Sequence, residues 1–281
     1  MTMANDEQAG FWSAMASTWV ELEDRLEEVA GPPGRMAMER LALRPGQRVV
    51  DLGCGTGRTT AELASRVSPG GEAVGVDIAP GMLDRGRERA KGLGLANVDF
   101  RQADVQVHDL GEGAFDAAYS RFGVMFFRDP AAAFGNVRRA LRPGAILSFV
   151  CWQTVFDNEW MLIPGAAAMS VLGGVPPVPS PEEPGPFSLA DRNRIRTVLA
   201  AAGFDQVEVS PRSDQLVIEE ALIPEVSRTS SRVGFVGEAL KDADDETRER
   251  VVTAIEEAWR ARVEDGALHA TRGFHLVSAR A

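Results

Sequence analysis

One acid and three glycines at every second position give the strongest chemical signal in the chain. The run Asp51-x-Gly53-x-Gly55-x-Gly57 follows an apolar pair, Val49-Val50, and precedes apolar residues that recur at helical spacing. Glycine lets the backbone turn tightly and removes the Cβ that would block a ligand. The free N–H groups at the start of a helix can then bind a carboxylate or a phosphate. Strand, glycine turn and helix predict the first βα unit of a nucleotide-binding fold.

Two further acids follow the next two expected strands. Asp77 ends the strand expected at 72–77, about 20 residues beyond the glycines, where a carboxylate can accept both hydroxyls of a ribose. The alternative role for Asp77 is a helix N-cap, because Pro80 stands near the start of the next helix. Asp104 is the last residue of the strand expected at 98–104. The alternative to a binding role is that Asp104 is only the first residue of a loop.

Strand and helix patterns alternate around these acids. Strands are expected at 48–51, 72–77, 98–104, 115–121 and 145–152. Four strand–helix alternations in about 100 residues predict a parallel sheet with helices on both faces. An open sheet of this kind binds ligands outside the carboxyl ends of its strands, so the glycine turn and both acids are expected at one edge.

Residues 49–152 resemble the class I S-adenosylmethionine (SAM) dependent methyltransferases, most closely those of ubiquinone and menaquinone biosynthesis. The resemblance rests on the glycine run, Asp77, Asp104, and the turns Ser120-Arg121-Phe122-Gly123 and Leu141-Arg142-Pro143-Gly144. It implies an α/β fold: a doubly wound, seven-stranded, Rossmann-like sheet in the order 3-2-1-4-5-7-6, with the last strand antiparallel. Segments 207–210 and 274–279 are the expected sixth and seventh strands.

The same resemblance implies the cofactor and the residues that hold it. The cofactor is SAM, the product is S-adenosyl-L-homocysteine, and Asp104 accepts a hydrogen bond from the adenine amino group. The expected cofactor-binding residues are Asp51, Gly53, Cys54, Gly55, Gly57, Thr59, Asp77, Ile78, Met82, Asp104, Val105 and Ser120.

The implied reaction is in-line transfer of the sulfonium methyl group to a small-molecule acceptor, either quinone-like or a secondary metabolite. One alternative is a SAM-binding protein of the same fold that catalyses a non-methylating rearrangement or acts as a sensor. A nicotinamide oxidoreductase is disfavoured, because Arg58 stands where the dinucleotide fingerprint has its third glycine.

A general base is needed only where the acceptor must lose a proton. His108 follows Asp104 in a loop and is the candidate catalytic residue, the alternative being an ordinary exposed histidine. Asp157 and Glu159 are further candidate bases. The candidate acceptor pocket consists of apolar side chains for which core packing is the other role: Trp19, Phe122, Met125, Trp152 and Trp160.

Four segments are expected along the chain. They are an N-terminal helical cap at 1–44, the SAM-binding core at 45–152, a lid or connection at 153–187, and the C-terminal part of the sheet at 188–281 with a helical insertion at 222–266. The insertion is interpreted as a substrate cover, an oligomer contact or a decoration of the fold. The cap and the 153–187 segment together are expected to form a lid over the cofactor, since methyl transfer requires a dry site.

The cap is expected to begin with an amphipathic helical segment at 7–29. It forms one helix or two helices broken near Ser17-Thr18, and Gly31-Pro32-Pro33-Gly34 is expected to end it. One interpretation of this segment is a solvated acidic face over a packed apolar face. The other is a cap over an active site, with Trp12 and Trp19 near the ligand.

The bulk composition excludes several classes of protein. A net charge of −11 and a pI near 4.9 argue against a nucleic-acid-binding surface. Two cysteines give neither a disulfide framework nor a zinc site, and no metal is expected. No apolar run reaches the roughly 18 residues of a membrane span, and the polar N-terminus is no signal peptide. We therefore expect a cytoplasmic monomer or homodimer whose partner is a small-molecule acceptor.

Overall fold

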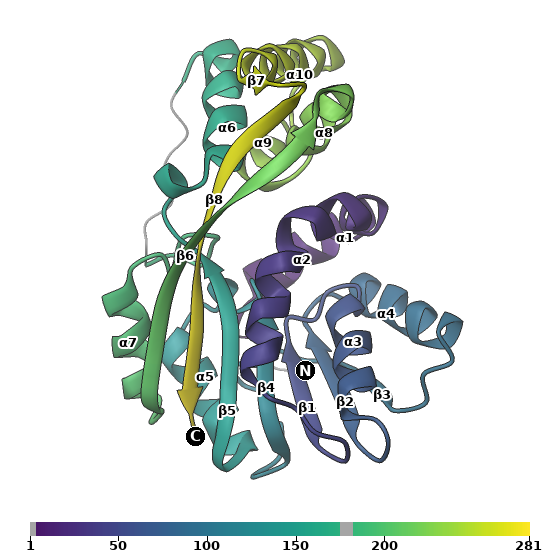
Figure 1. Ribbon diagram of the computed structural model, residues 1–281, viewed down its shortest axis with the longest axis vertical. Helices are drawn as coiled ribbons and strands as arrows, with labels where there is room; N and C mark the ends of the chain where they lie inside the picture. The colour runs from purple at the N-terminus through teal and green to yellow at the C-terminus, as the bar shows by residue number, and fades with distance from the viewer. Residues whose placement is uncertain (1–3, 175–181) are drawn as a thin grey trace. The chain divides into compact units, whose positions relative to one another are not determined.

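The computed structural model describes residues 4–174 and 182–281 (Figure 1). The chain forms two compact units. Of the described residues, 4–152, 182–211 and 274–281 belong to the first unit, and 153–174 and 212–273 belong to the second. Two long strands, β6 and β8, contribute residues to both units.

A largely parallel sheet forms the centre of the first unit. Its parallel strands are β1 (Arg48–Leu52), β2 (Glu72–Asp77), β3 (Val98–Gln102), β4 (Phe115–Arg121) and β5 (Leu141–Trp152). Antiparallel to β5 runs β8 (Ala267–Arg280), and beyond it lies β6 (Asp205–Glu219). The order β3-β2-β1-β4-β5-β8-β6 confirms the expected topology. An additional two-residue strand, β7 (Val263–Glu264), pairs with β8.

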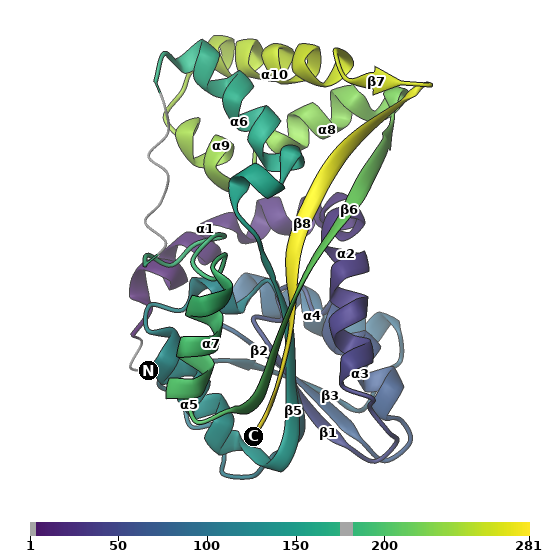
Figure 2. The same ribbon diagram turned by 60° about the vertical axis from the view of Figure 1, so that its left-hand side comes forward.

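Helices cover both faces of this sheet. Figure 2 shows α5 and α7 on one face, with α2 and α3 on the other. The helices of the first unit are α1 (Asp6–Glu21), α2 (Glu23–Arg40), α3 (Arg58–Val67), α4 (Pro80–Gly92), α5 (Pro130–Ala140), α7 (Arg192–Ala201) and the short η1 (Val124–Phe126). The central strands are buried on both faces, which explains why they read as continuous apolar runs.

The N-terminal helices differ from the sequence prediction in two respects. The break lies at Leu22 and not at Ser17-Thr18, and α2 continues through Gly31-Pro32-Pro33-Gly34. Close packing of α2 on β4 accounts for the second difference. The hydroxyl of Tyr119 donates to the Gly34 carbonyl at 2.9 Å, and a Cβ on Gly34 would lie 2.9 Å from that hydroxyl oxygen. Burial against the sheet thus overrides the local tendency of this motif to end a helix.

The second unit is helical and has its own hydrophobic core. It contains η2 (Val155–Asp157), α6 (Glu159–Leu172), η3 (Glu220–Leu222), α8 (Ile223–Ser230), α9 (Gly234–Ala239) and α10 (Asp245–Arg260). Helix α6 packs on α10, and the fully buried Trp259 is the largest side chain of the core. Residues 153–174 of the expected connection therefore belong with the 222–266 insertion, whereas 182–187 belong to the first unit. The proline-rich stretch at 175–181 lies outside the described residues.

Candidate functional site

The glycine turn joins the carboxyl end of β1 to the start of α3. Gly53, Gly55 and Gly57 all have positive φ angles, of 66°, 54° and 71°. A Cβ on Gly53 would lie 2.9 Å from the Cα of Gly123, and one on Gly57 would lie 2.6 Å from the Phe100 ring. At Gly55, by contrast, a Cβ would meet no atom within 4 Å. Two of the glycines are therefore required by packing, and Gly55 faces open space that a ligand can enter.

Asp77, the last residue of β2, is bonded to this turn. Its Oδ2 accepts the backbone N–H of Gly55 at 2.8 Å, and its Oδ1 accepts that of Ala79 at 2.9 Å. The carboxylate is only 9% exposed, and burial raises its pKa although both N–H groups oppose the rise. Helix α4 starts after Ala79, so Asp77 is not its N-cap residue. The acid thus stands beside the open position at Gly55.

Asp51 lies fully buried beneath the turn. Its Oδ2 accepts hydrogen bonds from the hydroxyls of Thr59 and Thr60, both at 2.7 Å. Its Oδ1 is buried and is one of the few such atoms in the described residues that have no hydrogen-bond partner. Burial raises the pKa of this carboxyl to about 6, against the opposing effect of the two hydroxyls and of Arg121. An unsatisfied buried acceptor of this kind fits a cationic hydrogen-bond donor on a ligand.

The other expected cofactor residues lie along the same carboxyl edge. Ser120 fixes β4 to β1 by donating to the Leu52 carbonyl at 2.7 Å. Cys54 is buried, and burial holds the pKa of its thiol well above the usual value, so it remains protonated. The structure also places at this edge Ile78, directly after β2, the buried Met82 in α4, and the buried Val105 after β3.

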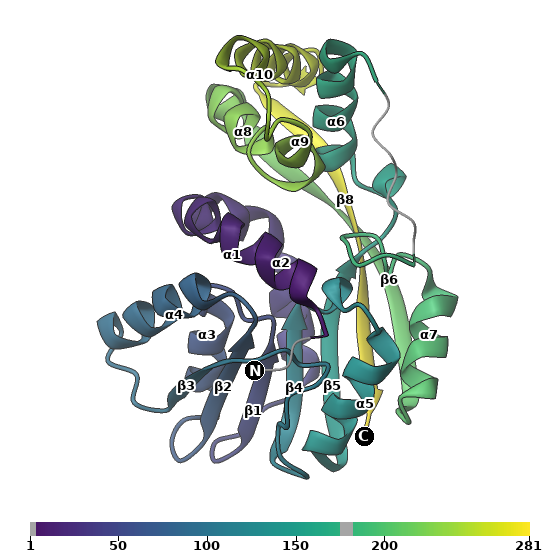
Figure 3. The same cartoon turned by 180° about the vertical axis from the view of Figure 1, so that it is seen from behind.

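Helix α1 packs beside the turn that follows Asp77 (Figure 3). Ala16, with Trp12 and Trp19, packs on Ala79 and Met82. The Trp12 ring also lies edge-on to Trp19 at 5.2 Å between centroids. The N-terminal helix therefore forms an apolar wall next to the expected ribose site.

Asp104 accepts hydrogen bonds from the chain's own N-terminal segment. Its Oδ2 accepts the backbone N–H groups of Ala4 and Asn5, at 2.7 and 3.0 Å. Its Oδ1 accepts the Asn5 side-chain amide and the Gln106 backbone N–H, both at 3.0 Å. The sequence gives no signal for Asn5, because only the fold brings residues about a hundred positions apart into contact.

Three of the expected acceptor-pocket residues form a cluster at the ends of β4 and β5. The rings of Phe122 and Trp152 stack at 3.7 Å with 13° between their planes, and the Trp152 backbone N–H donates to the Met125 sulfur at 3.4 Å. Phe122 has a φ of 61°, a conformation that costs a bulky residue energy and is concentrated at functional sites. Trp160 belongs to the second unit, where it packs against the core and donates to Asn158 at 3.0 Å.

The candidate bases have different surroundings. His108 is half-buried in the loop after β3, and its carbonyl accepts a hydrogen bond from Asn136 at 2.6 Å. In the second unit, Asp157 caps the short η2 helix through Thr154. Hydrogen bonds from Thr271, together with Arg262, lower the pKa of Glu159, which makes Glu159 a weaker base.

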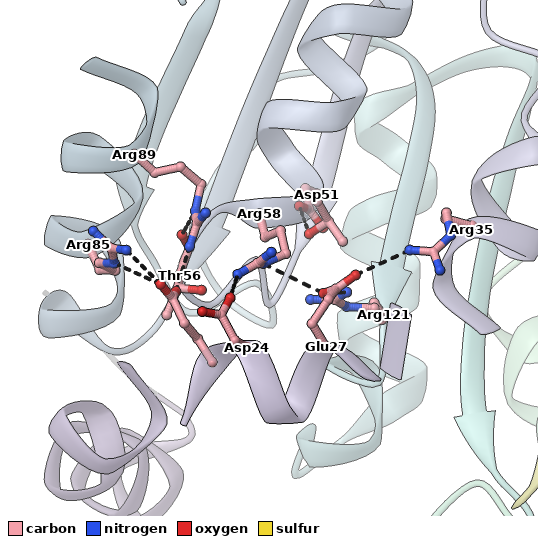
Figure 4. A network of polar contacts seen from close by, with 11 residues as sticks. Asp24, Glu27, Arg35, Asp51, Thr56, Arg58, Arg85, Arg89 and Arg121 are labelled. Atoms are coloured by element: carbon pink, nitrogen blue, oxygen red, sulfur yellow. Dashed lines mark hydrogen bonds and ion pairs between the residues drawn. The ribbon is translucent and has the colours of Figure 1, made fainter. Parts of the chain in front are cut away.

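Figure 4 shows a network of charged side chains that attaches α2 to the carboxyl edge of the sheet. Glu23 accepts from Arg85 at 2.6 Å and from Arg89 at 2.5 Å, and Arg89 also donates to the Thr56 carbonyl at 3.2 Å. Burial alone raises the pKa of Glu23, but the hydrogen bonds from both arginines outweigh it and hold the pKa below its usual range. The acidic face of this segment is therefore not simply solvated.

The second half of the same network centres on Glu27. Its carboxylate lies 2.5 Å from Arg121, 3.3 Å from Arg35 and 3.7 Å from Arg58, and Arg58 also pairs with Asp24. Arg58, the residue that departs from the dinucleotide fingerprint, therefore ties the glycine turn to α2. The spacing of the residues predicted the acidic face, but it did not indicate which arginines pair with that face.

The described residues contain no group of three or more His, Cys, Asp or Glu side chains arranged to hold a metal ion. Within the same residues, no helix is both long and apolar enough to cross a membrane. The site instead offers a glycine turn, two buried carboxylates and an apolar wall, which suit a ligand with a ribose and a cationic group.

Comparison with known proteins finds that this chain is similar to methyltransferases. Residues 49–144 match the family model described as a methyltransferase domain. The demethylmenaquinone methyltransferase of Staphylococcus carnosus is 27% identical over 62% of this chain and 75% of its own length. The ubiquinone/menaquinone biosynthesis C-methyltransferase of Ectopseudomonas mendocina is 39% identical over 40% of this chain, and this chain spans 44% of that relative.

A solved structure extends the comparison of the fold. Phosphoethanolamine N-methyltransferase 2 of Haemonchus contortus, in complex with phosphomonomethylethanolamine and S-adenosylhomocysteine, has a TM-score of 0.54 with this protein. The two are 18% identical, and the match covers 88% of this chain and 52% of that one.

Proposed function

Residues 49–144 of this chain belong to the class I SAM-dependent methyltransferases, and we propose that the protein transfers the methyl group of SAM to a small-molecule acceptor. The observation that carries the proposal is the bond between Asp77 and the glycine turn beside the open position at Gly55. Asp77 would hold the ribose hydroxyls, and the turn would hold the methionine part.

Methyl transfer from SAM requires few catalytic side chains, and the main task of the protein is to position the two reactants. The sulfonium methyl is already activated, so the site must hold it in line with the acceptor and exclude water. The apolar wall of α1 and the stacked pair Phe122–Trp152 support a dry site. The finer proposal is an aromatic, quinone-like acceptor that packs beside this aromatic pair. His108 is proposed as the base for an acceptor that must lose a proton.

Turnover tests this function directly. Purified protein is incubated with SAM and a panel of quinols, phenols and amines, and formation of S-adenosylhomocysteine and methylated product is measured. We expect micromolar SAM binding and acceptor-dependent turnover. Tight SAM binding without methylation of any acceptor would favour the non-methylating alternative. Binding of NAD in preference to SAM would overturn the proposal.

The buried carboxyl of Asp51 makes cofactor affinity dependent on pH. Its pKa is about 6 without ligand, and the ammonium group of the cofactor would stabilise the charged form. Affinity for S-adenosylhomocysteine should therefore rise between pH 5 and pH 7 and then level off. Since about one carboxyl in ten is ionised at pH 5, binding there should be about tenfold weaker than at pH 7. Calorimetry across this range measures the effect.

Two controls accompany the pH experiment. The variant Asp51→Asn should bind more weakly and show a flat profile between pH 5 and pH 7. Folding stability should move in the opposite sense, because the folded state holds the Asp51 proton more tightly than the unfolded chain. The contribution of Asp51 to stability therefore falls as pH rises from about 4 to 6. An affinity that does not change with pH in the wild type would contradict the proposed contact.

A further inference from the structure

The carboxylate of Asp104 is fully occupied by donors from its own chain. It is 2% exposed and accepts two hydrogen bonds at each oxygen, three of the four coming from residues 4 and 5. An ionised carboxylate has about four acceptor positions in all. An adenine amino group could reach Asp104 only by displacing the N-terminal segment, which would exchange three hydrogen bonds to this charge for one.

Asn5 joins three segments at the carboxyl edge of the sheet: the N-terminal segment, the loop after β3 and the segment around Arg128. Its side-chain amide donates to Asp104, and its Oδ1 accepts the backbone N–H of Arg128 at 2.8 Å. Asn5 is itself 5% exposed, and α1 begins at the following residue. Helix α1 is thus fixed at two places, by Asn5 after β3 and by its apolar face on Ala79 and Met82 after β2. A nucleoside held by Asp77 would lie beside this helix.

A polar hollow of about 570 Å³ adjoins the same contacts. The segments joined by Asn5 form its walls, with lining residues Ala4, Asp6, Gln106, Arg128, Asp129 and Pro130. Asn5 is hydrogen-bonded to two of these walls, at Asp104 after β3 and at the backbone of Arg128.

We propose that Asn5 is a positioning residue of the cofactor site and that Asp104 acts through Asn5, without a direct bond to the adenine amino group. This inference rests on the proposed function. Asp104 holds the N-terminal segment in place, and that segment closes the adenine end of the site.

A double-mutant cycle tests whether the two residues act as one unit. Binding of S-adenosylhomocysteine is measured for the wild type, Asn5→Ala, Asp104→Ala and the double variant. We expect each single substitution to weaken binding at least tenfold. The affinity of the double variant should equal that of the weaker-binding single variant, within twofold. Amide hydrogen exchange in residues 6–21 should accelerate in all three variants.

The matched control is Asn97→Ala. The Asn97 side-chain amide likewise makes two hydrogen bonds. It donates to the carbonyls of Ala64 and Gly71 at 2.9 and 3.1 Å, at the opposite end of β3. This variant should lose stability and keep its affinity for S-adenosylhomocysteine.

A second ligand separates the proposed role of Asp104 from direct recognition of the base. S-inosylhomocysteine carries a carbonyl oxygen where adenine has its amino group. We expect the ratio of the two affinities to be the same in the wild type and in Asp104→Ala, within twofold. A ratio that collapses in Asp104→Ala would show that Asp104 bonds the adenine directly and would overturn the inference.

Asn5→Ala decides the question even if Asp104→Ala does not fold. Tighter binding by Asn5→Ala would mean that Asn5 competes with the adenine, and unchanged binding would mean that it has no role. Either result overturns the inference while leaving the proposed function intact. If the wild type itself does not bind S-adenosylhomocysteine, the proposed function fails as well.

Discussion

The variant Gly55→Val is expected to lose binding of SAM and S-adenosylhomocysteine by at least a hundredfold while remaining folded. Of the three glycines in the turn, Gly55 is the one at which an added Cβ meets no protein atom within 4 Å. A valine side chain would therefore enter the space assigned to the ligand. Its φ of 54° adds a strain of about 1–3 kcal/mol, which a domain with a stability of about 5–15 kcal/mol tolerates. Calorimetric titration measures the loss of binding.

Gly46→Val is the matched control for this prediction. Gly46 has a φ of 86° and likewise faces open space, but it precedes β1 and so lies at the opposite edge of the sheet. Both variants should unfold at a lower temperature by similar amounts, and only Gly55→Val should lose binding. If Gly55→Val keeps its affinity in a protein that melts cooperatively, the turn does not cradle the ligand.

The parallel sheet and its glycine edge could be predicted because their signals are local. A buried strand, a glycine run and a helix follow one another within about 20 residues, and each carries its own pattern. The strand order came from the family resemblance and agrees with the structure, including the antiparallel β8. The position of Asp77 beside the turn could be predicted because an acid at the end of the second strand stands at a fixed sequence distance from the glycines.

The attachment of the N-terminal helices could not be predicted, because it depends on contacts distant in sequence. Glu23 and Glu27 read as part of a solvated face, yet their arginine partners lie on α3, α4 and β4. Asn5 gave no signal because its partner, Asp104, is 99 residues away. The helix α2 continues through two prolines because burial against the sheet outweighs local propensity there.

The division of the C-terminal half between the two units could not be predicted from the sequence either. Residues 153–174 and 212–273 fold around one core, although about forty residues separate them in the chain. A pattern read along the chain assigns such segments separately, because nothing in either segment indicates its partner.

Removing the carboxylate of Asp77 is expected to be the most damaging single change that leaves the glycine turn's sequence intact. Each hydrogen bond between this charge and a ribose hydroxyl contributes roughly 1.5–3 kcal/mol, so the loss of even one weakens binding about tenfold or more. Asp77→Ala also leaves the Gly55 N–H without its acceptor and loosens the turn. Asp77→Asn keeps an acceptor and loses the charge, so its affinity should lie between those of Asp77→Ala and the wild type.

A half-buried acid at the other edge of the same sheet provides the comparison. Asp116 accepts the backbone N–H of Arg48 at 2.7 Å and pairs with Arg142, much as Asp77 accepts two backbone N–H groups. Asp116→Ala should lower the melting temperature and leave the affinity for S-adenosylhomocysteine within twofold of the wild type. Asp77→Ala also removes the acceptor of two backbone N–H groups, so it should lower the melting temperature to a similar degree, but in this variant binding should be lost as well. Equal affinities for Asp77→Ala and the wild type would rule out Asp77 as the ribose anchor and place the nucleoside elsewhere on the carboxyl edge.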